Sequence, residues 1–313
     1  MTTKEKNNIN IPLAFDYKFK KIFGDNDDID CLEALIALYF DIPYESVKGK
    51  VTILDGEKRK NRIKQKGGKS DIYLRLELQS GNTRIDIEVS DTKLSQSIVD
   101  RNVLYGVHNL TTQLQSSDDY SLLEPVIVIC FDKGIIGENN NYLIDKYTLR
   151  NESGHKLTNK LQIHHINIEN CYKEWYNKSI NNYDISKQNI VKFGALLNIK
   201  DNNEFDKCLG GIPMSKEVKN KIKTINVELN EIGEVGMWWY DAERDRLAKE
   251  RGMMADIKKI ATEQGIEQGI KQGIKQGIEH EKIELAKKML VKGISIDDVS
   301  NITGLEKKHL EKL

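Results

Sequence analysis

Two segments that alternate between apolar and polar residues constrain this chain more than any other feature. They are SDIYLRLEL (70–78) and TRIDIEV (83–89), with QSGN between them. Alternation with a period of two sends successive side chains to opposite faces of a strand, and a short glycine-containing link joins two such strands as a hairpin. We therefore predict an antiparallel β-hairpin with one apolar face and one polar face.

A turn centred on Ser80 and Gly81 sets the expected register of this hairpin. The expected pairs are Ile72 with Val89, Leu74 with Ile87, Leu76 with Ile85, Arg75 with Asp86, and Glu77 with Arg84. Each pair joins like apolar groups or opposite charges and contributes ~0.2–1 kcal/mol. A slip by one residue would turn each apolar set to the wrong face, so the faces are well specified.

The same register makes Asp71 and Glu88 diagonal neighbours on the polar face, because Asp71 lies opposite Ser90 and Tyr73 opposite Glu88. Diagonal neighbours lie roughly 5–8 Å apart. Two carboxylates at that spacing suit a hard divalent cation such as Mg²⁺, which also takes water and phosphate oxygens. The alternative is that both acids are solvated members of a polar strand face, which the hairpin taken alone favours.

The loop before the hairpin, DGEKRKNRIKQKGGK (55–69), is rich in positive charge. Its basic residues from position 58 onward are Lys58, Arg59, Lys60, Arg62, Lys64, Lys66 and Lys69. Because 48 Lys and Arg balance 48 Asp and Glu, any attraction to nucleic acid must come from such a local patch. Beside a carboxylate pair the loop would neutralise phosphates without reading sequence; otherwise it is a soluble loop.

Apolar periodicity predicts the order of the other elements. We expect a helix over 27–40, a strand over 51–54, the hairpin, a helix over 95–115, a strand at PVIVICF (125–131) buried on both faces, and a strand near 161–168, followed by helices over 186–198, 215–232 and 238–262. The predicted domains are a core over 1–185, a helical extension over 186–262, a repeat over 263–279 and a small helical tail over 280–313.

The segment EQGIEQGIKQGIKQGIE (263–279) repeats every four residues, with each of Gly265, Gly269, Gly273 and Gly277 followed by isoleucine. A helix there forgoes about 1 kcal/mol per glycine relative to alanine. Two interpretations stand equally: a self-association segment that would make a homo-oligomer, or an exposed helical spacer. The tail GISIDDVSNITGLEKKHLEKL (293–313) has helix-turn-helix proportions, and a helical end cap is an equal alternative.

Several classes of protein are disfavoured by the composition. Cys31, Cys130, Cys171 and Cys208 form no CxxC pair, which argues against a zinc knuckle or a disulfide framework. No segment approaches 18 consecutive apolar residues, and the first residues carry no apolar run fit for a signal peptide. We therefore expect a cytoplasmic protein with reduced thiols and no membrane partner.

The order helix, three strands, helix, strand, with an aspartate on the second strand and Glu-x-polar on the third, resembles the PD-(D/E)XK nuclease fold. More narrowly, FDYKFKKIFGD (15–25), SDIYLRLELQSGNTRIDIEVS (70–90) and RNVLYG (101–106) are similar to recombination-promoting nucleases, the PD-(D/E)XK transposases. The repeat and the tail are similar to the carboxyl ends of that family. The resemblance implies an α/β, restriction-endonuclease-like core, a mixed sheet flanked by helices, with a helical carboxyl-terminal extension.

What the resemblance implies about function is a metal-dependent DNA endonuclease that promotes recombination or transposition. Asp71 and Glu88 would hold Mg²⁺ or Mn²⁺, and position 90 would orient or activate the attacking water. Asp16 and Lys18 match the amino-terminal motif, and Arg101 with Tyr105 match positions on the following helix that would contact DNA.

Two positions depart from the family pattern. Ser70 stands where the motif has proline, and Ser90 where it has glutamine or lysine. A serine hydroxyl is shorter, uncharged and a poor electrostatic stabiliser. Either Lys93 or Gln96, at the start of the next helix, takes over the role, or the chain is a catalytically impaired nuclease-fold protein that binds DNA or self-assembles.

Overall fold

The computed structural model describes residues 9–54, 57–58, 68–134, 141–310 and 312, and the side chains of these except 57–58, 68–69, 240–269, 272 and 279. The chain divides into two compact units, Met1–Asp241 and Ala242–Leu313, and each is described by itself. The predicted domain boundaries after residues 185, 262 and 279 stay predictions.

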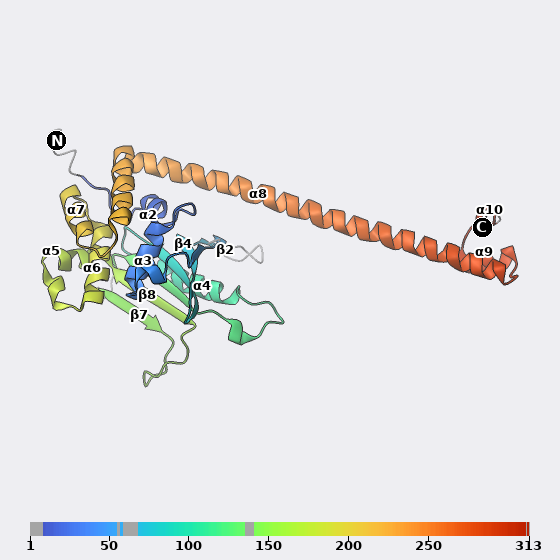
Figure 1. Cartoon of the computed structure of the whole chain (residues 1–313), viewed down its shortest axis with the longest axis horizontal. Helices are drawn as coiled ribbons and strands as arrows, with labels where there is room; N and C mark the ends of the chain where they lie inside the picture. The colour runs from blue at the N-terminus through green and yellow to red at the C-terminus, as the bar shows by residue number, and fades with distance from the viewer. Residues whose placement is uncertain (1–8, 55–56, 59–67, 135–140, 311, 313) are drawn as a thin grey trace. The chain divides into compact units, whose positions relative to one another are not determined.

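The first unit is built on a mixed sheet (Figure 1). Within the described residues its six strands lie in the order β1 (Val51–Ile53), β4 (Ile72–Leu78), β5 (Gly81–Val89), β6 (Val126–Asp132), β8 (Leu161–Asn167) and β7 (Ile144–Thr148). Strands β5, β6 and β8 are parallel, whereas β1 and β4 at one side and β7 at the other run antiparallel to their neighbours. A separate two-stranded pair joins β2 (Glu57–Lys58) to β3 (Gly68–Lys69). The predicted mixed α/β sheet is thus confirmed.

Helices cover both faces of this sheet. The main core packs α2 (Asp16–Phe23), α3 (Asp30–Phe40), α5 (Ile168–Tyr176), α6 (Ile185–Asn198) and α7 (Asn202–Gly210) with the apolar residues of one sheet face. On the other face, α4 (Gln96–Thr111) packs against β6 and β8. The approach is close at Gly106, where a Cβ would lie 2.8 Å from Leu161 Cδ1 and 3.0 Å from Val128 Cγ2.

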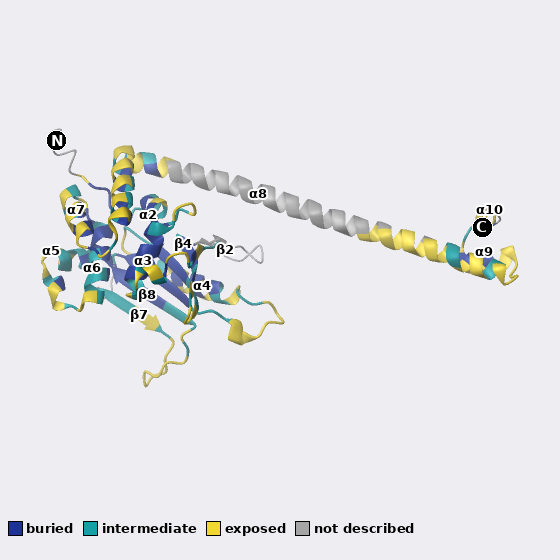
Figure 2. Cartoon of the chain, in the orientation of Figure 1, coloured by how far each residue is buried: buried dark blue, intermediate teal, exposed yellow. Residues whose placement is uncertain are grey.

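Helix α4 lies over a sheet whose strands are largely buried (Figure 2). The acidic residues of β5 are accordingly buried rather than solvated. Asp86 is fully buried, and Glu88 is only 6% exposed. The interpretation of Asp71 and Glu88 as solvated members of a strand face is therefore wrong for Glu88. The polar residues of this strand correctly indicate that its second face is polar. That face lies beneath a helix rather than in solvent.

The observed hairpin register differs from the predicted one by two residues. Leu78 pairs with Gly81, so the turn residues are Gln79 and Ser80, and Leu74 faces Ile85. Gly81 has φ 121°, a left-handed value that glycine adopts most readily. A shift of two residues is one full period of a strand. Each residue therefore stays on its predicted face, although it pairs with a different residue of the other strand.

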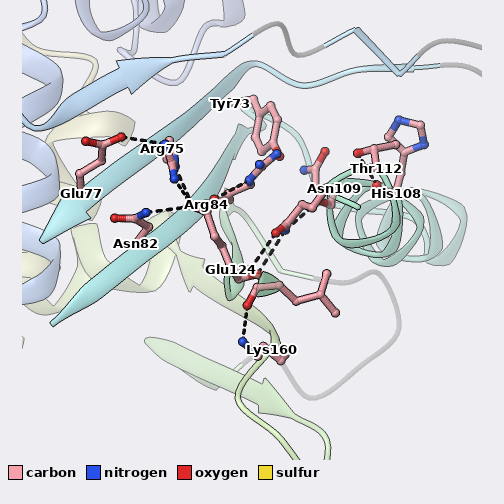
Figure 3. A network of polar contacts seen from close by, with 12 residues as sticks. Tyr73, Arg75, Glu77, Asn82, Arg84, His108, Asn109, Thr112, Glu124 and Lys160 are labelled. Carbon is pink, nitrogen blue, oxygen red and sulfur yellow. Dashed lines mark hydrogen bonds and ion pairs between the residues drawn. The ribbon is translucent and has the colours of Figure 1, made fainter. Parts of the chain in front are cut away.

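The predicted pairs of Arg75 with Asp86 and Glu77 with Arg84 are therefore wrong. Arg75 instead lies opposite Arg84. Figure 3 shows both guanidinium groups turned to Glu124, whose Oε1 is 2.8 Å from Arg75 Nε and whose Oε2 is 2.8 Å from Arg84 Nε. This carboxylate, from the segment before β6, offsets the repulsion between the two arginines.

The remaining elements are helical. They are the 3₁₀ turns η1 (Tyr44–Ser46), η2 (Tyr120–Leu122) and η3 (Ser179–Asn182), and the helices α8 (Lys216–Val291), α9 (Ile296–Thr303) and α10 (Lys307–Leu310). Helix α8 contains both helices expected over 215–262 and the repeat, and it is interrupted at Gly233, which has φ 76° and ψ 168°. Among the described helices, none is long and apolar enough to cross a bilayer. Helices α2, α5 and α7 and strands β2, β3 and β7 were not predicted.

Candidate functional site

Asp71 and Glu88 lie beside each other at the end of the hairpin opposite its turn. Asp71 directly precedes β4, and Glu88 is the penultimate residue of β5. The Val89 N–H donates to Asp71 Oδ2 at 2.9 Å, and the Asp71 N–H donates to Glu88 Oε1 at 3.3 Å. The observed register thus makes the two acids direct cross-strand neighbours rather than diagonal ones, and it brings them closer together than the predicted register does.

Each carboxylate also faces a cation. Lys20 Nζ, on α2, lies 2.9 Å from Asp71 Oδ1 and 2.6 Å from Asp16 Oδ1. Arg101 Nη2, on α4, lies 3.5 Å from Glu88 Oε2. Three carboxylates against two cations leave one unit of negative charge in this group. Because unbalanced charge is costly in a buried site, the group favours one more cation.

The pKa values of the two acids reflect the same imbalance. Burial raises the pKa of Asp71 to about 6, against the opposing attraction of Lys20 and with further repulsion from Asp16. Burial, followed by repulsion from Asp71 and Asp86, raises the pKa of Glu88 well above its ordinary range. A bound divalent cation would reverse these shifts, because it favours the ionised form of each carboxylate.

The two carboxylates open onto a cavity of about 290 Å³. Its polar lining residues are Asp16, Asp71, Glu88, Ser90, Arg101, Asn102 and Asp132. Asn102 is buried, and its Oδ1 has no hydrogen-bond partner among the described residues, while its Nδ2 donates to Cys130 Sγ at 3.3 Å. A buried acceptor of this kind needs a hydrogen-bond donor, such as an ordered water molecule.

These oxygen atoms fit Mg²⁺ or Mn²⁺. In the part of the chain that the structure describes, no group of three His, Cys, Asp or Glu could enclose a metal ion. Magnesium does not require such a cage, because it is commonly bound by one or two carboxylates and fills its shell with water and phosphate oxygens. Asp71 and Glu88 would supply the carboxylates, and Asn102 Oδ1 would supply an acceptor for the surrounding water.

The residue at position 90 does not extend toward the carboxylates. Ser90 Oγ is 3.1 Å from Thr92 O and 3.2 Å from Thr92 Oγ1, a local turn. Ser90 itself lines the cavity, whereas the two proposed stand-ins, Lys93 and Gln96, do not. Lys93 is exposed, and Gln96 Nε2 donates to Asp100 Oδ1 at 2.9 Å on the surface of α4.

The two residues of the amino-terminal motif, Asp16 and Lys18, lie in different surroundings in the structure. Asp16 lines the cavity, whereas Lys18 is fully buried elsewhere and donates from Nζ to Ile11 O and to Asn230 Oδ1, both at 2.7 Å. Burial lowers the pKa of Lys18 to about 7. Lys18 therefore ties the amino-terminal segment to α8, and Lys20, one helical turn after Asp16, is the lysine of this helix that pairs with Asp71.

The residues that were matched to DNA contact are placed in part. The Tyr105 ring is buried, and its centroid lies 5.5 Å from Arg101 Cζ, so the ring supports the guanidinium beside Glu88. Arg59, Lys60, Arg62, Lys64 and Lys66 lie outside the described residues. Lys58 and Lys69 belong to β2 and β3, but their side chains are not described. The roles of these residues stay predictions.

Sequence reasoning missed Lys20, Asn102 and Asp132. A signal existed for Lys20, because residues four apart on a helix share a face and Asp16 was already a motif residue. None existed for Asp132, which ends β6 and whose Oδ2 is 2.6 Å from His165 Nδ1 on β8. Their proximity depends on the parallel pairing of two strands far apart in sequence.

A family model described as "PD-(D/E)XK nuclease family transposase" matches residues 13–232 of the chain. The match covers most of the sequence and includes all the residues of the cavity. A search of curated proteins and a search of solved structures each returned no match.

Proposed function

The chain belongs to the PD-(D/E)XK nuclease family of transposases, and we propose that it is a Mg²⁺-dependent or Mn²⁺-dependent endonuclease that hydrolyses DNA phosphodiester bonds during recombination or transposition. One observation carries the proposal. It is the buried Asp71–Glu88 pair, joined by backbone hydrogen bonds at the edge of a cavity in which acids outnumber bases.

Asp71 and Glu88 would hold the ion through the oxygens that now face Lys20 and Arg101. A divalent ion there would lower the pKa of a bound water molecule and would draw negative charge away from the phosphoryl oxygens. The chain's own contribution is to fix these carboxylates, because each has one oxygen already engaged by a backbone N–H. Fixed ligands need no rearrangement during the reaction.

The reaction is the addition of water across a phosphorus–oxygen ester bond. The water oxygen bonds to phosphorus, and the ester bond breaks with its electron pair going to the leaving oxygen. The water gives up one proton to solvent and the leaving oxygen takes one from solvent, so the products are a phosphomonoester and an alcohol. Arg101, whose side chain is 48% exposed, would bind a phosphate of the same strand with its planar guanidinium.

A second candidate is a catalytically impaired protein that binds DNA or self-assembles. The engagement of Ser90 Oγ with Thr92 favours it, because position 90 then contributes no charge to the site. The exposed isoleucines of the repeat, Ile270, Ile274 and Ile278, favour the self-assembly form.

Nicking of supercoiled plasmid separates the two candidates. We expect cleavage in Mg²⁺, none in a chelator, and a loss of at least about 100-fold in Asp71→Asn and in Glu88→Gln, a magnitude typical of removing one charged group from a site of this kind. Glu77→Gln is the matched control, because Glu77 is an exposed acid on the same hairpin and lies outside the cavity. Equal nicking by all four proteins, or none by the wild type, would remove the nuclease proposal.

A further inference from the structure

The site has a carboxylate pair and a water acceptor, but position 90 supplies no cation. Ser90 lies on the cavity wall two residues after Glu88, and its N–H donates to Phe131 O at 2.8 Å. Its hydroxyl is held by Thr92. In a phosphodiester hydrolase that uses one metal site, a fixed positive charge beside the metal ligands stabilises the charge that develops on the phosphoryl group.

Lys20 is the nearest cation to Asp71 among the described residues. Its Nζ lies 2.9 Å from Asp71 Oδ1, and its side chain is 18% exposed. The neighbouring lysines point elsewhere: Lys21 pairs with Asp25 at 2.9 Å, and Lys133 with Asp91 at 3.7 Å. Arg101 faces the other acid, Glu88, at the longer distance of 3.5 Å.

Helix α2 holds Lys20 in this position through its packing. Phe19 is fully buried, and its ring centroid is 6.4 Å from that of Phe131, a residue of the cavity wall. Ile22 and Phe23 are also buried in the core. The helix is thus anchored on the strand that pairs with β5, and Asp16, one turn before Lys20, provides a second acceptor for the ammonium. A group fixed by packing and by two acceptors is preorganised.

We propose that Lys20, from α2, supplies the charge that Ser90 lacks, by donating a hydrogen bond to a phosphoryl oxygen of the scissile phosphate. This inference rests on the proposed nuclease function. An ammonium has three N–H groups, and Lys20 Nζ lies 2.9 Å from Asp71 Oδ1 and 2.6 Å and 2.7 Å from the two oxygens of Asp16. Asp16 can keep one of these bonds while the phosphoryl oxygen takes the place of its second oxygen. Lys20 stays charged throughout and transfers no proton, so the balance of the hydrolysis is unchanged.

The test combines removal of this charge with its restoration from position 90. Lys20→Met keeps the length of the side chain and removes the ammonium, and we expect kcat to fall about 100-fold to 1,000-fold, with KM within about threefold, because the charge acts on the transition state. Lys21→Met, on the same helix but paired with Asp25, is the matched control and is expected to keep wild-type kcat. Lys20→Arg keeps the charge and is expected to retain at least a tenth of kcat.

The double variant Lys20→Met/Ser90→Lys is the decisive protein. A lysine at position 90 starts from the same cavity wall, so we expect it to recover at least about tenfold of the kcat lost in Lys20→Met. A structural role of Lys20 would not be restored in this way. Thermal unfolding of each variant shows whether it folds. If Lys20→Met does not fold, the kcat of Lys20→Arg tests the proposal instead.

The outcomes separate the two proposals. Wild-type kcat in Lys20→Met overturns the role of Lys20 and leaves the nuclease intact. A loss in Lys20→Met that neither arginine at position 20 nor lysine at position 90 restores also overturns it, because the loss is then structural. No cleavage by the wild type in Mg²⁺ or Mn²⁺ removes the function and the role of Lys20 together.

Discussion

Replacing Asp71 with asparagine is expected to stabilise the protein while abolishing its activity. The buried carboxylate has a pKa of about 6 in the folded state against an ordinary value of 3.8. Between these two pH values the folded state binds more protons at Asp71 than the unfolded state does, so stability falls as the pH rises through this window. Above pH 6 the full cost is present.

The magnitude follows from the shift. About two pKa units correspond to roughly 3 kcal/mol, at about 1.4 kcal/mol per unit. The side chain is 13% exposed, and an asparagine would lose the attraction of Lys20, so we expect a net gain of about 1–2 kcal/mol for Asp71→Asn near pH 7.5. At about pH 4 the Asp71 carboxyl is neutral in the folded state and about half neutral in the unfolded state, so most of the pH-dependent difference in stability should be lost.

Urea unfolding without divalent ions, at about pH 4 and about pH 7.5, measures this difference. The isosteric Glu77→Gln variant, at an exposed position, controls for the loss of a carboxylate as such. Mg²⁺ at 100 times its dissociation constant should add about 2.7 kcal/mol to the wild type and much less to Asp71→Asn. An Asp71→Asn effect that is the same at both pH values would refute the attribution to the buried charge.

Three other predictions concern the site, the sheet and the repeat. Cleavage at limiting Mg²⁺ should rise as the pH rises through about 6, since protons compete with the ion for Asp71; a rate independent of pH between about 5 and 8 would contradict the competition. Gly106→Val should destabilise the protein by about 1–3 kcal/mol in urea unfolding, because its Cβ would press on Leu161 and Val128, and unchanged stability would argue against this close approach. If the repeat mediates self-association, deletion of residues 263–279 should lower the mass measured by light scattering, and an unchanged mass would leave the repeat as a spacer.

The sequence predicted the faces of the hairpin but not its partners. Leu74 and Ile87 were assigned to the apolar face correctly, because alternation specifies a face whatever the register. The register depends on which two residues form the turn, and cross-strand charge matching misled the choice. Arg75 and Arg84 lie opposite each other because Glu124, a residue about 40 positions further along the chain, binds both.

The sequence analysis named both acids of the candidate site, but it missed Lys20, one of the two cations that face them. Asp71 and Glu88 are local to the hairpin, so the pattern around them was sufficient. Lys20 lies about 50 residues earlier, on a helix of 8 residues that was not predicted, although its buried residues Phe19, Ile22 and Phe23 have helical spacing. The burial of Glu88 was also invisible, because it depends on how α4 packs across the sheet.

The central claim is that Asp71 and Glu88 together hold a divalent metal ion. Anomalous-difference density from crystals soaked in Mn²⁺ near pH 7.5, above the pKa of Asp71, tests it most directly. We expect a single strong peak about 2.0–2.2 Å from an oxygen of each carboxylate. A map with no peak between these two side chains, or with manganese bound only elsewhere on the chain, would contradict the account.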